Sequence, residues 1–319
     1  MKKIFLLICS VVLLAACTSK PTGSLTIGVL KGPSAISVAQ WLQQSPVIAG
    51  KKVKIVVCDE VSDLQALMIQ KKVDFALLPT TMAAILYNKG VDYRMVACPV
   101  QGSIYVVSSD SISSFDDLKN RKIGISGQGT TPDVLFELLA KRHGFTLQEQ
   151  HLDFSIGTHA DLAQAVVLGK IKTALLPEPF VTLVCTKNPK VKPVVNLAGE
   201  LAKSDSSTLF ALTAFVVCKS MVEQQKTVVD SVAKRYQVAI EWLYAHPERT
   251  AQAVVDAKVL PNVQVALRSI PRCGIRYISA SAASVRIADY LRIFLNFDPK
   301  TVGGRLPDSN FYYFTQDVK

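Results

Sequence analysis

One stretch of this chain occurs twice, and the duplication limits the folds that the chain can adopt. The residues from Asp161 to Phe180 repeat, without a gap, the pattern that begins at Asp63. Each copy starts with apolar residues at helical spacing and then reaches the run Ala-Leu-Leu-Pro, at residues 76–79 and 174–177. Each copy therefore predicts a helix followed by a short buried strand that ends at a proline.

A second helix is expected after each of these strands. Thr80 and Thr81 can cap the helix that follows the first strand, predicted over 75–78. Pro179 suits the first turn of the helix that follows the second strand, predicted over 173–176.

Another pair of segments matches at nearly the same spacing. Ile27-Gly28-Val29 corresponds to Ile123-Gly124-Ile125, and each leads into a loop marked by Gly and Pro, at residues 31–34 and 127–132. Two similar α/β units are therefore expected, each with two helix N-termini at the carboxyl ends of its strands. Ligands bind at that edge of an open α/β sheet, so two such edges facing one another predict a ligand-binding cleft.

The chain begins with an export signal. Lys2 and Lys3 precede the apolar run from Ile4 to Leu14, which is too short to cross a membrane, and Leu14-Ala15-Ala16-Cys17 resembles a bacterial lipobox. We expect a signal peptide over 1–16, a lipidated Cys17 and a tether over 17–24. A retained N-terminal anchor is the alternative, and either outcome places the body outside the cytoplasm.

The composition of 319 residues, 49% apolar and 19% charged, predicts a globular chain with room for two domains. The net charge of +11 would attract anionic lipid or an anionic ligand, although a solvated basic surface is the simpler explanation. The lysines are scattered, so no nucleic-acid groove is predicted. Four dispersed histidines and seven cysteines without a CxxC pair indicate neither a metal site nor a cofactor.

Three loops offer hydrogen-bond donors at the predicted cleft. Lys31, Gly32, Pro33 and Ser34 form the first loop, and the threonine pair 80–81 forms the second. The third loop consists of Gln128, Gly129, Thr130 and Thr131, ahead of a helix whose free N–H groups suit a carboxylate, sulfonate or phosphate. Asp133 already uses part of that positive field.

Glu178 takes the place in the second copy that Thr80 holds in the first. It can face a ligand that carries an amine, a ring donor or a hydroxyl, with Phe180 as an apolar wall. Alternatively, Glu178 caps its own helix. No function is predicted for the segment from Ile270 to Tyr277.

Together these features resemble the type II periplasmic-binding-protein fold, and more narrowly the substrate-binding lipoproteins of ABC importers in the nitrate, sulfonate, taurine and thiamine-precursor group. The resemblance is carried by the lipobox and the duplicated units, and by the motifs Gly127 to Pro132, Gly169 to Phe180 and Gly303-Gly304-Arg305-Leu306-Pro307.

The resemblance implies an α/β clamshell with two lobes, each a mixed sheet flanked by helices, and a double chain crossing. Lobe 1 would comprise 25–108 and 212–319, and lobe 2 would comprise 109–211. It implies ligand contacts in the loops named above, at Lys31 to Ser34, Thr80, Thr81, Gln128 to Thr131, Glu178 and Phe180. It further implies a monomer that binds a small-molecule ligand, meets ABC permease and ATPase subunits, is anchored to the membrane by its N-terminal lipid and catalyses no reaction.

Two other classes of function remain open on the same fold. One is a sensor or adhesin lipoprotein without an importer. The other is an enzyme that resembles the pyrimidine synthases, which act inside the cell and carry a Cys-rich motif that this sequence lacks. Within transport, we expect a small organic solute with both an acid group and a donor, or alternatively a flat aromatic vitamin precursor.

Overall fold

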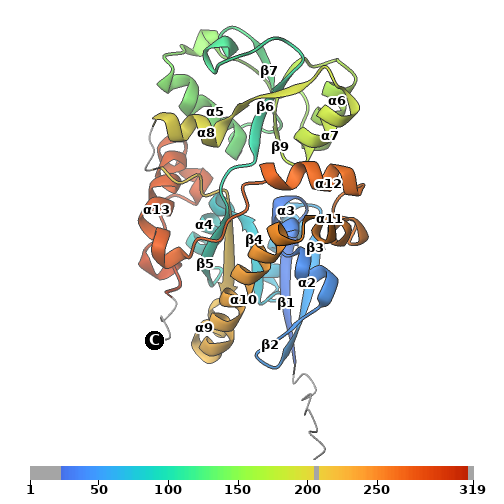
Figure 1. Ribbon diagram of the computed structural model, residues 1–319. Coiled ribbons are helices and arrows are strands. Elements are labelled where there is room, and N and C mark those ends of the chain that lie inside the picture. The colour runs from blue at the N-terminus through green and yellow to red at the C-terminus, as the bar shows by residue number, and fades with distance from the viewer. Residues whose placement is uncertain (1–22, 205–207, 315–319) are drawn as a thin grey trace, which may run out of the picture.

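The computed structural model describes residues 23–204 and 208–314, and these residues form two lobes (Figure 1). Each lobe contains one mixed β-sheet covered by helices. The expected signal peptide, the lipidation site Cys17 and most of the tether lie outside the described residues. Among the described helices, none has the length and apolar character needed to span a bilayer.

Lobe 1 is built on a six-stranded sheet in the order β2-β3-β1-β4-β11-β5. Strands β1, β3 and β4 run parallel, whereas β11 is antiparallel to both of its neighbours. The strands are β1 (Gly23–Leu30), β2 (Val47–Ile48), β3 (Lys51–Cys58), β4 (Phe75–Pro79), β5 (Tyr93–Val100) and β11 (Thr213–Cys218). β1 includes Gly23 and Ser24, which pair with Lys51 and Lys52, so the predicted tether ends two residues earlier than expected.

Helices cover both faces of this sheet because its strands carry apolar side chains on both sides. Phe75 and Phe215 stack with ring centroids 5.4 Å apart, and Tyr236 of α10 packs against Phe215. The helices are α1 (Pro33–Ser37), α2 (Ala39–Gln44), α3 (Val61–Ile69), α4 (Thr80–Asn88), α9 (Lys219–Gln224), α10 (Lys226–Ala245), α11 (Pro247–Asp256), α12 (Val263–Ser269) and α13 (Ala280–Phe297). Three 3₁₀ turns follow α12 and α13: η3 (Ile270–Arg272), η4 (Pro299–Val302) and η5 (Ser309–Phe311).

Lobe 2 repeats the plan with a five-stranded sheet in the order β10-β6-β9-β7-β8. Its strands are β6 (Ile104–Ser108), β7 (Lys122–Gly124), β8 (His151–Asp153), β9 (Thr173–Pro177) and β10 (Lys192–Asn196). Its helices are α5 (Thr131–Arg142), α6 (His159–Val167), α7 (Phe180–Lys187) and α8 (Leu197–Ser204), with 3₁₀ turns η1 (Asp116–Leu118) and η2 (Leu147–Glu149).

The duplication predicted from the sequence is confirmed as α3-β4-α4 in lobe 1 and α6-β9-α7 in lobe 2. The packing repeats as well as the order of elements. A Cβ on Gly28 would meet Leu64 at 2.4 Å, and a Cβ on Gly124 would meet Leu162 at 2.8 Å. The matching glycine in each lobe thus admits the matching leucine of the following helix onto the sheet.

The chain crosses between the lobes at residues 101–103 and again between α8 and β11. The crossings are adjacent, because the N–H of Leu212 donates to the carbonyl of Val100 at 3.0 Å. The expected lobe boundary after residue 108 is wrong, because β6 pairs with β9 and β10 in the sheet of lobe 2. The apolar residues of β6 would suit either sheet, and only the strands with which β6 pairs show that it belongs to lobe 2.

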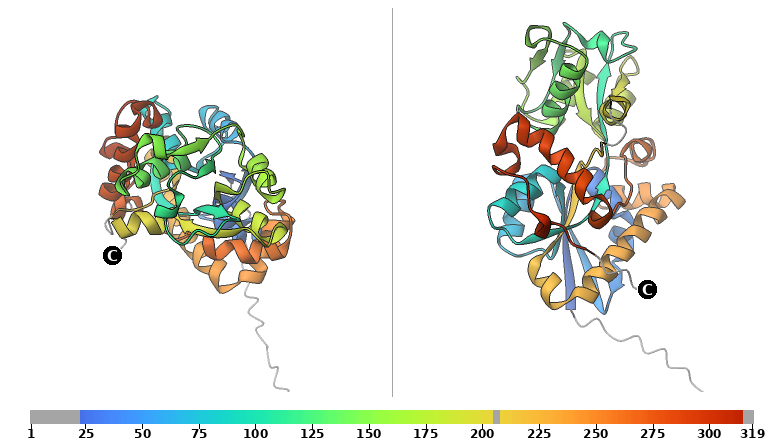
Figure 2. Two further views of the ribbon diagram at one scale, coloured as in Figure 1. Left: turned by 90° about the horizontal axis from the view of Figure 1, so that it is seen from above. Right: turned by 90° about the vertical axis from the view of Figure 1, so that its left-hand side faces the viewer.

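Two further segments contact both lobes. Helix α13 packs against β5 in lobe 1 and against α5 in lobe 2. It runs along the left-hand side of the molecule in Figure 1 and faces the viewer in Figure 2 (right). The segment after η3 lies along the first crossing, where the N–H of Gln101 donates to the carbonyl of Gly274 at 2.9 Å. The segment 270–277, without a predicted function, therefore lines the hinge.

Candidate ligand-binding site

Parallel strands bring the helix starts of each lobe to one edge of its sheet. In lobe 2, β7, β8 and β9 run parallel, so α5, α6 and α7 begin at the same carboxyl edge. Ile104 of β6 pairs with Pro177, the last residue of β9, so the chain enters lobe 2 at this edge. In lobe 1, the chain leaves from Val100, at the carboxyl edge of the sheet. The two carboxyl edges, hereafter the facing edges, therefore lie opposite each other.

The first predicted loop of lobe 1 contacts lobe 2. Gly32 has a φ of 93°, and a Cβ there would lie 3.6 Å from Cδ of Pro179 and 3.7 Å from the carbonyl of Glu178. Lys31 forms an ion pair with Asp59, and both side chains are exposed. Ser34 is buried, and its carbonyl accepts a hydrogen bond from Ser37 Oγ at 2.7 Å. Gly32 therefore lies close to the other lobe in this structure.

Thr80 begins α4 and carries a hydroxyl that no described group binds. The residue is 1% exposed, and its Oγ1 has no hydrogen-bond partner within the described ranges. α4 has no side-chain cap and no acidic residue in its first turn. The neighbouring Thr81 is half-buried. A buried hydroxyl without a partner is costly, so this position is suited to a ligand that supplies the missing hydrogen bond.

The loop before α5 uses its own donors. The N–H of Gly129 donates to Oδ2 of Asp133 at 2.7 Å, and Oγ1 of Thr130 donates to the carbonyl of Gly127 at 2.7 Å. Asp133 is fully buried, which raises the pKa of its carboxyl, while the bond from Gly129 acts in the opposite direction. Gln128 and Thr130 are exposed and Thr131 is half-buried. Asp133, in the first turn of α5, therefore already binds the N–H of Gly129 in the loop predicted to receive a ligand's acid group.

Glu178 caps its own helix, as one of its two interpretations predicted. Its carboxylate accepts from the N–H of Thr182 at 3.1 Å and from Oγ1 of Thr182 at 3.0 Å. The same carboxylate, 0% exposed, accepts from Nε of Arg272 in lobe 1 at 2.5 Å. Both of its oxygens are thus used by the protein.

The sequence did not indicate Arg272 as a residue of the candidate site. Its Nη2 donates to Oγ1 of Thr182 at 2.5 Å, and its carbonyl accepts from the hydroxyl of Tyr105 at 3.2 Å. Tyr105 and Thr182 belong to lobe 2, whereas Arg272 belongs to lobe 1, so these contacts connect the facing edges. Nothing in the local sequence pairs residue 272 with residue 178, since the contact depends on the tertiary fold.

His159 was also missed, because a lone histidine carries no pattern. Nδ1 of His159 lies 2.5 Å from Oγ of Ser126, and its ring centroid lies 6.0 Å from that of Phe180. Burial lowers the pKa of His159 to about 4, so the imidazole is neutral near pH 7. These three residues follow β8, β7 and β9, which puts a neutral polar and aromatic group on the facing edge of lobe 2.

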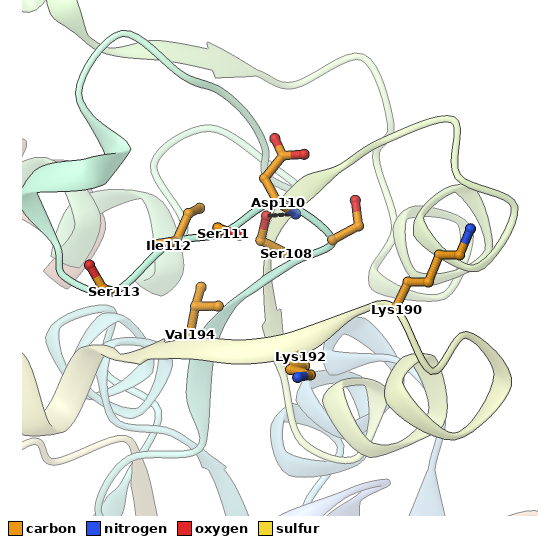
Figure 3. Close-up of a pocket in the computed structure, with 9 residues that line it drawn as sticks. Ser108, Asp110, Ser111, Ile112, Ser113, Lys190, Lys192 and Val194 are labelled. Atoms are coloured by element: carbon orange, nitrogen blue, oxygen red, sulfur yellow. Dashed lines mark hydrogen bonds between the residues drawn. The ribbon is translucent and has the colours of Figure 1, made fainter.

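Two surface cavities of the described chain lie at the other end of lobe 2. The first, of about 380 Å³, is formed by residues 108–113 with Lys190, Lys192 and Val194 (Figure 3). Ser108 is at the end of β6 remote from Pro177, and its Oγ accepts from the N–H of Asp110 at 3.0 Å. The second cavity, of about 530 Å³, adjoins the first residues of β7 and β8. Both therefore lie away from the facing edges.

Within the described ranges, no three His, Cys, Asp or Glu residues gather as metal ligands would. The five described cysteines are all free thiols.

The chain matches known proteins over most of its length. The family described as NMT1/THI5 like matches residues 47–250. Among solved structures, an ABC transporter from Parabacteroides distasonis is 31% identical, with 92% of this chain and 99% of that chain covered and a TM-score of 0.81. No match is found among curated proteins.

More distant solved structures share the fold. The periplasmic aliphatic sulphonate binding protein SsuA from Escherichia coli is 14% identical, covers 89% of this chain and 96% of its own, and has a TM-score of 0.68. A Candida albicans gene product described as having the generic periplasmic binding protein fold is 14% identical, covers 93% and 99%, and has a TM-score of 0.59. The fold expected from the sequence is confirmed, and the chain belongs to the NMT1/THI5-like family, with the two-lobed fold of periplasmic binding proteins.

Proposed function

We propose that this protein is an extracytoplasmic solute-binding lipoprotein, which holds a small organic solute between its two lobes and delivers it to an ABC importer. The observation that carries the proposal is the pair of facing edges, joined by two crossings and connected by the Arg272–Glu178 ion pair. Two similar solved structures support it, one named as an ABC transporter and the other as the ligand-binding component of an ABC-type import system. In this account Cys17 carries the lipid anchor, the permease and ATPase receive the solute, and the protein catalyses no reaction.

We assign the solute to the facing edges rather than to the two surface cavities. Lobe 1 contributes the loop from Lys31 to Ser34 and the hydroxyls of Thr80 and Thr81. Lobe 2 contributes the residues from Gln128 to Thr131, the ring of Phe180 and the imidazole of His159. Glu178 has a different role, because its carboxylate is bound by Thr182 and Arg272. It supports closure of the lobes.

Binding between lobes implies a change of shape that a membrane permease can recognise. The segments at 101–103 and 208–212 are short and adjacent, which is the arrangement expected of a hinge. In this structure Gly32 lies close to Pro179, and Arg272 binds Glu178 across the lobes, so a solute enters only after the lobes separate.

A thermal-shift panel on the soluble body, from Ser19 onward, tests the function. The panel contains sulfonates, nitrate, amino acids, thiamine and flavin precursors. A solute that binds only the folded state, present at a free concentration of 100 times its Kd, raises the free energy of unfolding by about 2.7 kcal/mol. We expect at least one class of solute to raise the melting temperature, with one site per chain by calorimetry. A protein that responds to none of them would favour the sensor or adhesin alternative.

A further inference from the structure

Three helices begin at the facing edge of lobe 2, and each would attract an anion if its N-terminus were free. α5, α6 and α7 have 12, 9 and 8 residues, long enough for a helix dipole to develop. The unpaired N–H groups at a helix start bind carboxylate, sulfonate and phosphate groups. Whether protein groups already lie at these three helix starts therefore decides whether this edge accepts an anionic ligand.

Each of the three helix starts has a carboxylate of the protein in its first turn or in the residues just before it. At α7, Glu178 accepts from the N–H of Thr182 at 3.1 Å. At α6, Asp161 forms a reciprocal cap with Thr158, whose Oγ1 donates to Asp161 Oδ2 at 2.7 Å and accepts from the N–H of Asp161 at 3.1 Å. At α5, Asp133 accepts from the N–H of Gly129 at 2.7 Å.

Asp133 differs from exposed Asp161 in being buried, and it differs from buried Glu178 in having one carboxylate oxygen without a hydrogen-bond partner among the described residues. Its side chain is inaccessible to solvent, and its Oδ1 has no hydrogen-bond partner among the described residues. Glu178 is compensated by Arg272, and Asp161 is exposed to water. An anion placed beside the loop 127–130 would therefore meet an uncompensated negative oxygen where water screens charge poorly.

The cations identified at the facing edges do not offset this charge. Lys31 is paired with Asp59, and Arg272 is paired with Glu178. His159 carries no positive charge near neutral pH, because burial lowers the pKa of its imidazole. The aromatic ring of Phe180 and the hydroxyl of Ser126 lie beside His159 and are also neutral. The groups described at this edge of lobe 2 are therefore neutral side chains and carboxylates of the protein.

We infer that the facing edge of lobe 2 rejects strongly anionic solutes such as sulfonates, sulfate and nitrate, with Asp133 as the specificity-determining residue. The inference rests on the proposed function, and it narrows the ligand to a solute that is uncharged or cationic where it meets lobe 2. It separates this chain from the sulphonate-binding protein that shares its fold.

Calorimetric titration with methanesulfonate and sodium sulfate tests the inference on the wild-type soluble body and on three variants. Asp133→Asn keeps the size of the side chain and an acceptor for Gly129 but removes the charge. Asp161→Asn removes an exposed carboxylate from the neighbouring helix start and decides the matter if Asp133→Asn does not fold. Asp110→Asn, at the opposite end of lobe 2, is the control, and circular dichroism verifies that each variant is folded.

The wild type and Asp110→Asn should show no binding at 10 mM of either salt. Asp133→Asn should gain methanesulfonate binding by at least about tenfold, and Asp161→Asn by a smaller factor of about 2 to 5, since water screens the exposed charge. A wild type that binds methanesulfonate with a Kd below about 100 µM, or folded Asn variants that bind no better than the wild type, would overturn the inference.

These results separate the inference from the function on which it rests. A wild type that binds sulfonates tightly would overturn the rejection of anions and support a solute-binding role. A protein that binds no solute of any charge would count against the function itself.

Discussion

Nε of Arg272 lies 2.5 Å from Oε1 of Glu178, and this ion pair joins the two lobes across the facing edges. Arg272 belongs to the turn after α12 in lobe 1, whereas Glu178 ends the loop before α7 in lobe 2. The carboxylate is fully buried and the arginine side chain is 34% exposed. Opening the lobes would break the ion pair and expose both charges to water. The pair therefore stabilises the arrangement in which the two lobes are in contact.

Replacing Arg272 with Met should open the lobes and lower the stability. The variant leaves the buried carboxylate of Glu178 with Thr182 as its remaining partner. We expect the free energy of unfolding to fall by about 1 to 3 kcal/mol. This loss is smaller than for a fully buried pair, because water partly screens Arg272. Urea titration measures the loss, and small-angle scattering should show a larger radius of gyration. Arg276→Met, in the same segment but bonded to Gln101, should change stability by less than about 0.5 kcal/mol. Equal effects of both changes would contradict the account.

Adding a methyl group to Gly274 should disturb the hinge. Gly274 has a φ of 61°, and its Cβ would lie 2.8 Å from the carbonyl oxygen of Gln101 in the first crossing. Gly144 has a similar φ of 74° but open space around it, so Gly144→Ala should cost only the backbone strain of about 1 to 2 kcal/mol. Gly274→Ala should cost about 3 kcal/mol or more, because the backbone must also move. Equal losses in thermal unfolding would show that the approach to Gln101 is unimportant.

Removing the hydroxyl of Thr80 should separate ligand binding from folding. Thr80→Val deletes a buried Oγ1 that has no partner, so the ligand-free protein should be unchanged or more stable by about 1 kcal/mol. Affinity for the solute should fall by up to about tenfold if a neutral hydrogen bond is lost. Thr182→Val is the matched comparison, because its hydroxyl donates to Glu178 and accepts from Arg272, and its loss should lower the melting temperature. An unchanged affinity of Thr80→Val would remove Thr80 from the site.

Burial of His159 predicts that stability falls with acidification. The pKa of His159 is about 4 in the folded protein, whereas an unfolded chain has a value of about 6.5. Between these values only the unfolded state binds the proton, so the free energy of unfolding decreases as the pH falls from 6.5 to 4, by at most about 3 kcal/mol. His159→Gln should flatten this part of the pH profile in urea titrations. His151→Gln, at an exposed position, should leave the slope unchanged.

The features recovered from the sequence are those set by local chemistry. The helix-strand-helix repeats follow from apolar periodicity and from Pro79 and Pro177, which end their strands at the predicted places. The facing loops follow from Gly32, Gly127 and Gly129, whose positive φ values let the chain turn ahead of a helix.

Tertiary contacts decided what the sequence left open. Glu178 is the type of residue that either caps a helix or meets a ligand, and only the approach of Arg272 from the other lobe distinguishes the two. Asp133 was seen to oppose an anion, but its complete burial was not visible. The lobe boundary was misplaced because the apolar strand 104–108 fits either sheet until its partners are known.

Mass spectrometry of the purified soluble body, from Ser19 onward, would show whether the two lobes close on a ligand. The protein is measured under native conditions and again after denaturation, and any small molecule that is released is identified. The account predicts one organic solute per chain, which carries no sulfonate or sulfate group and rebinds wild type more tightly than Thr80→Val. A protein that carries no solute, and that none of the screened solutes stabilises, would contradict the claim that its lobes close on a ligand.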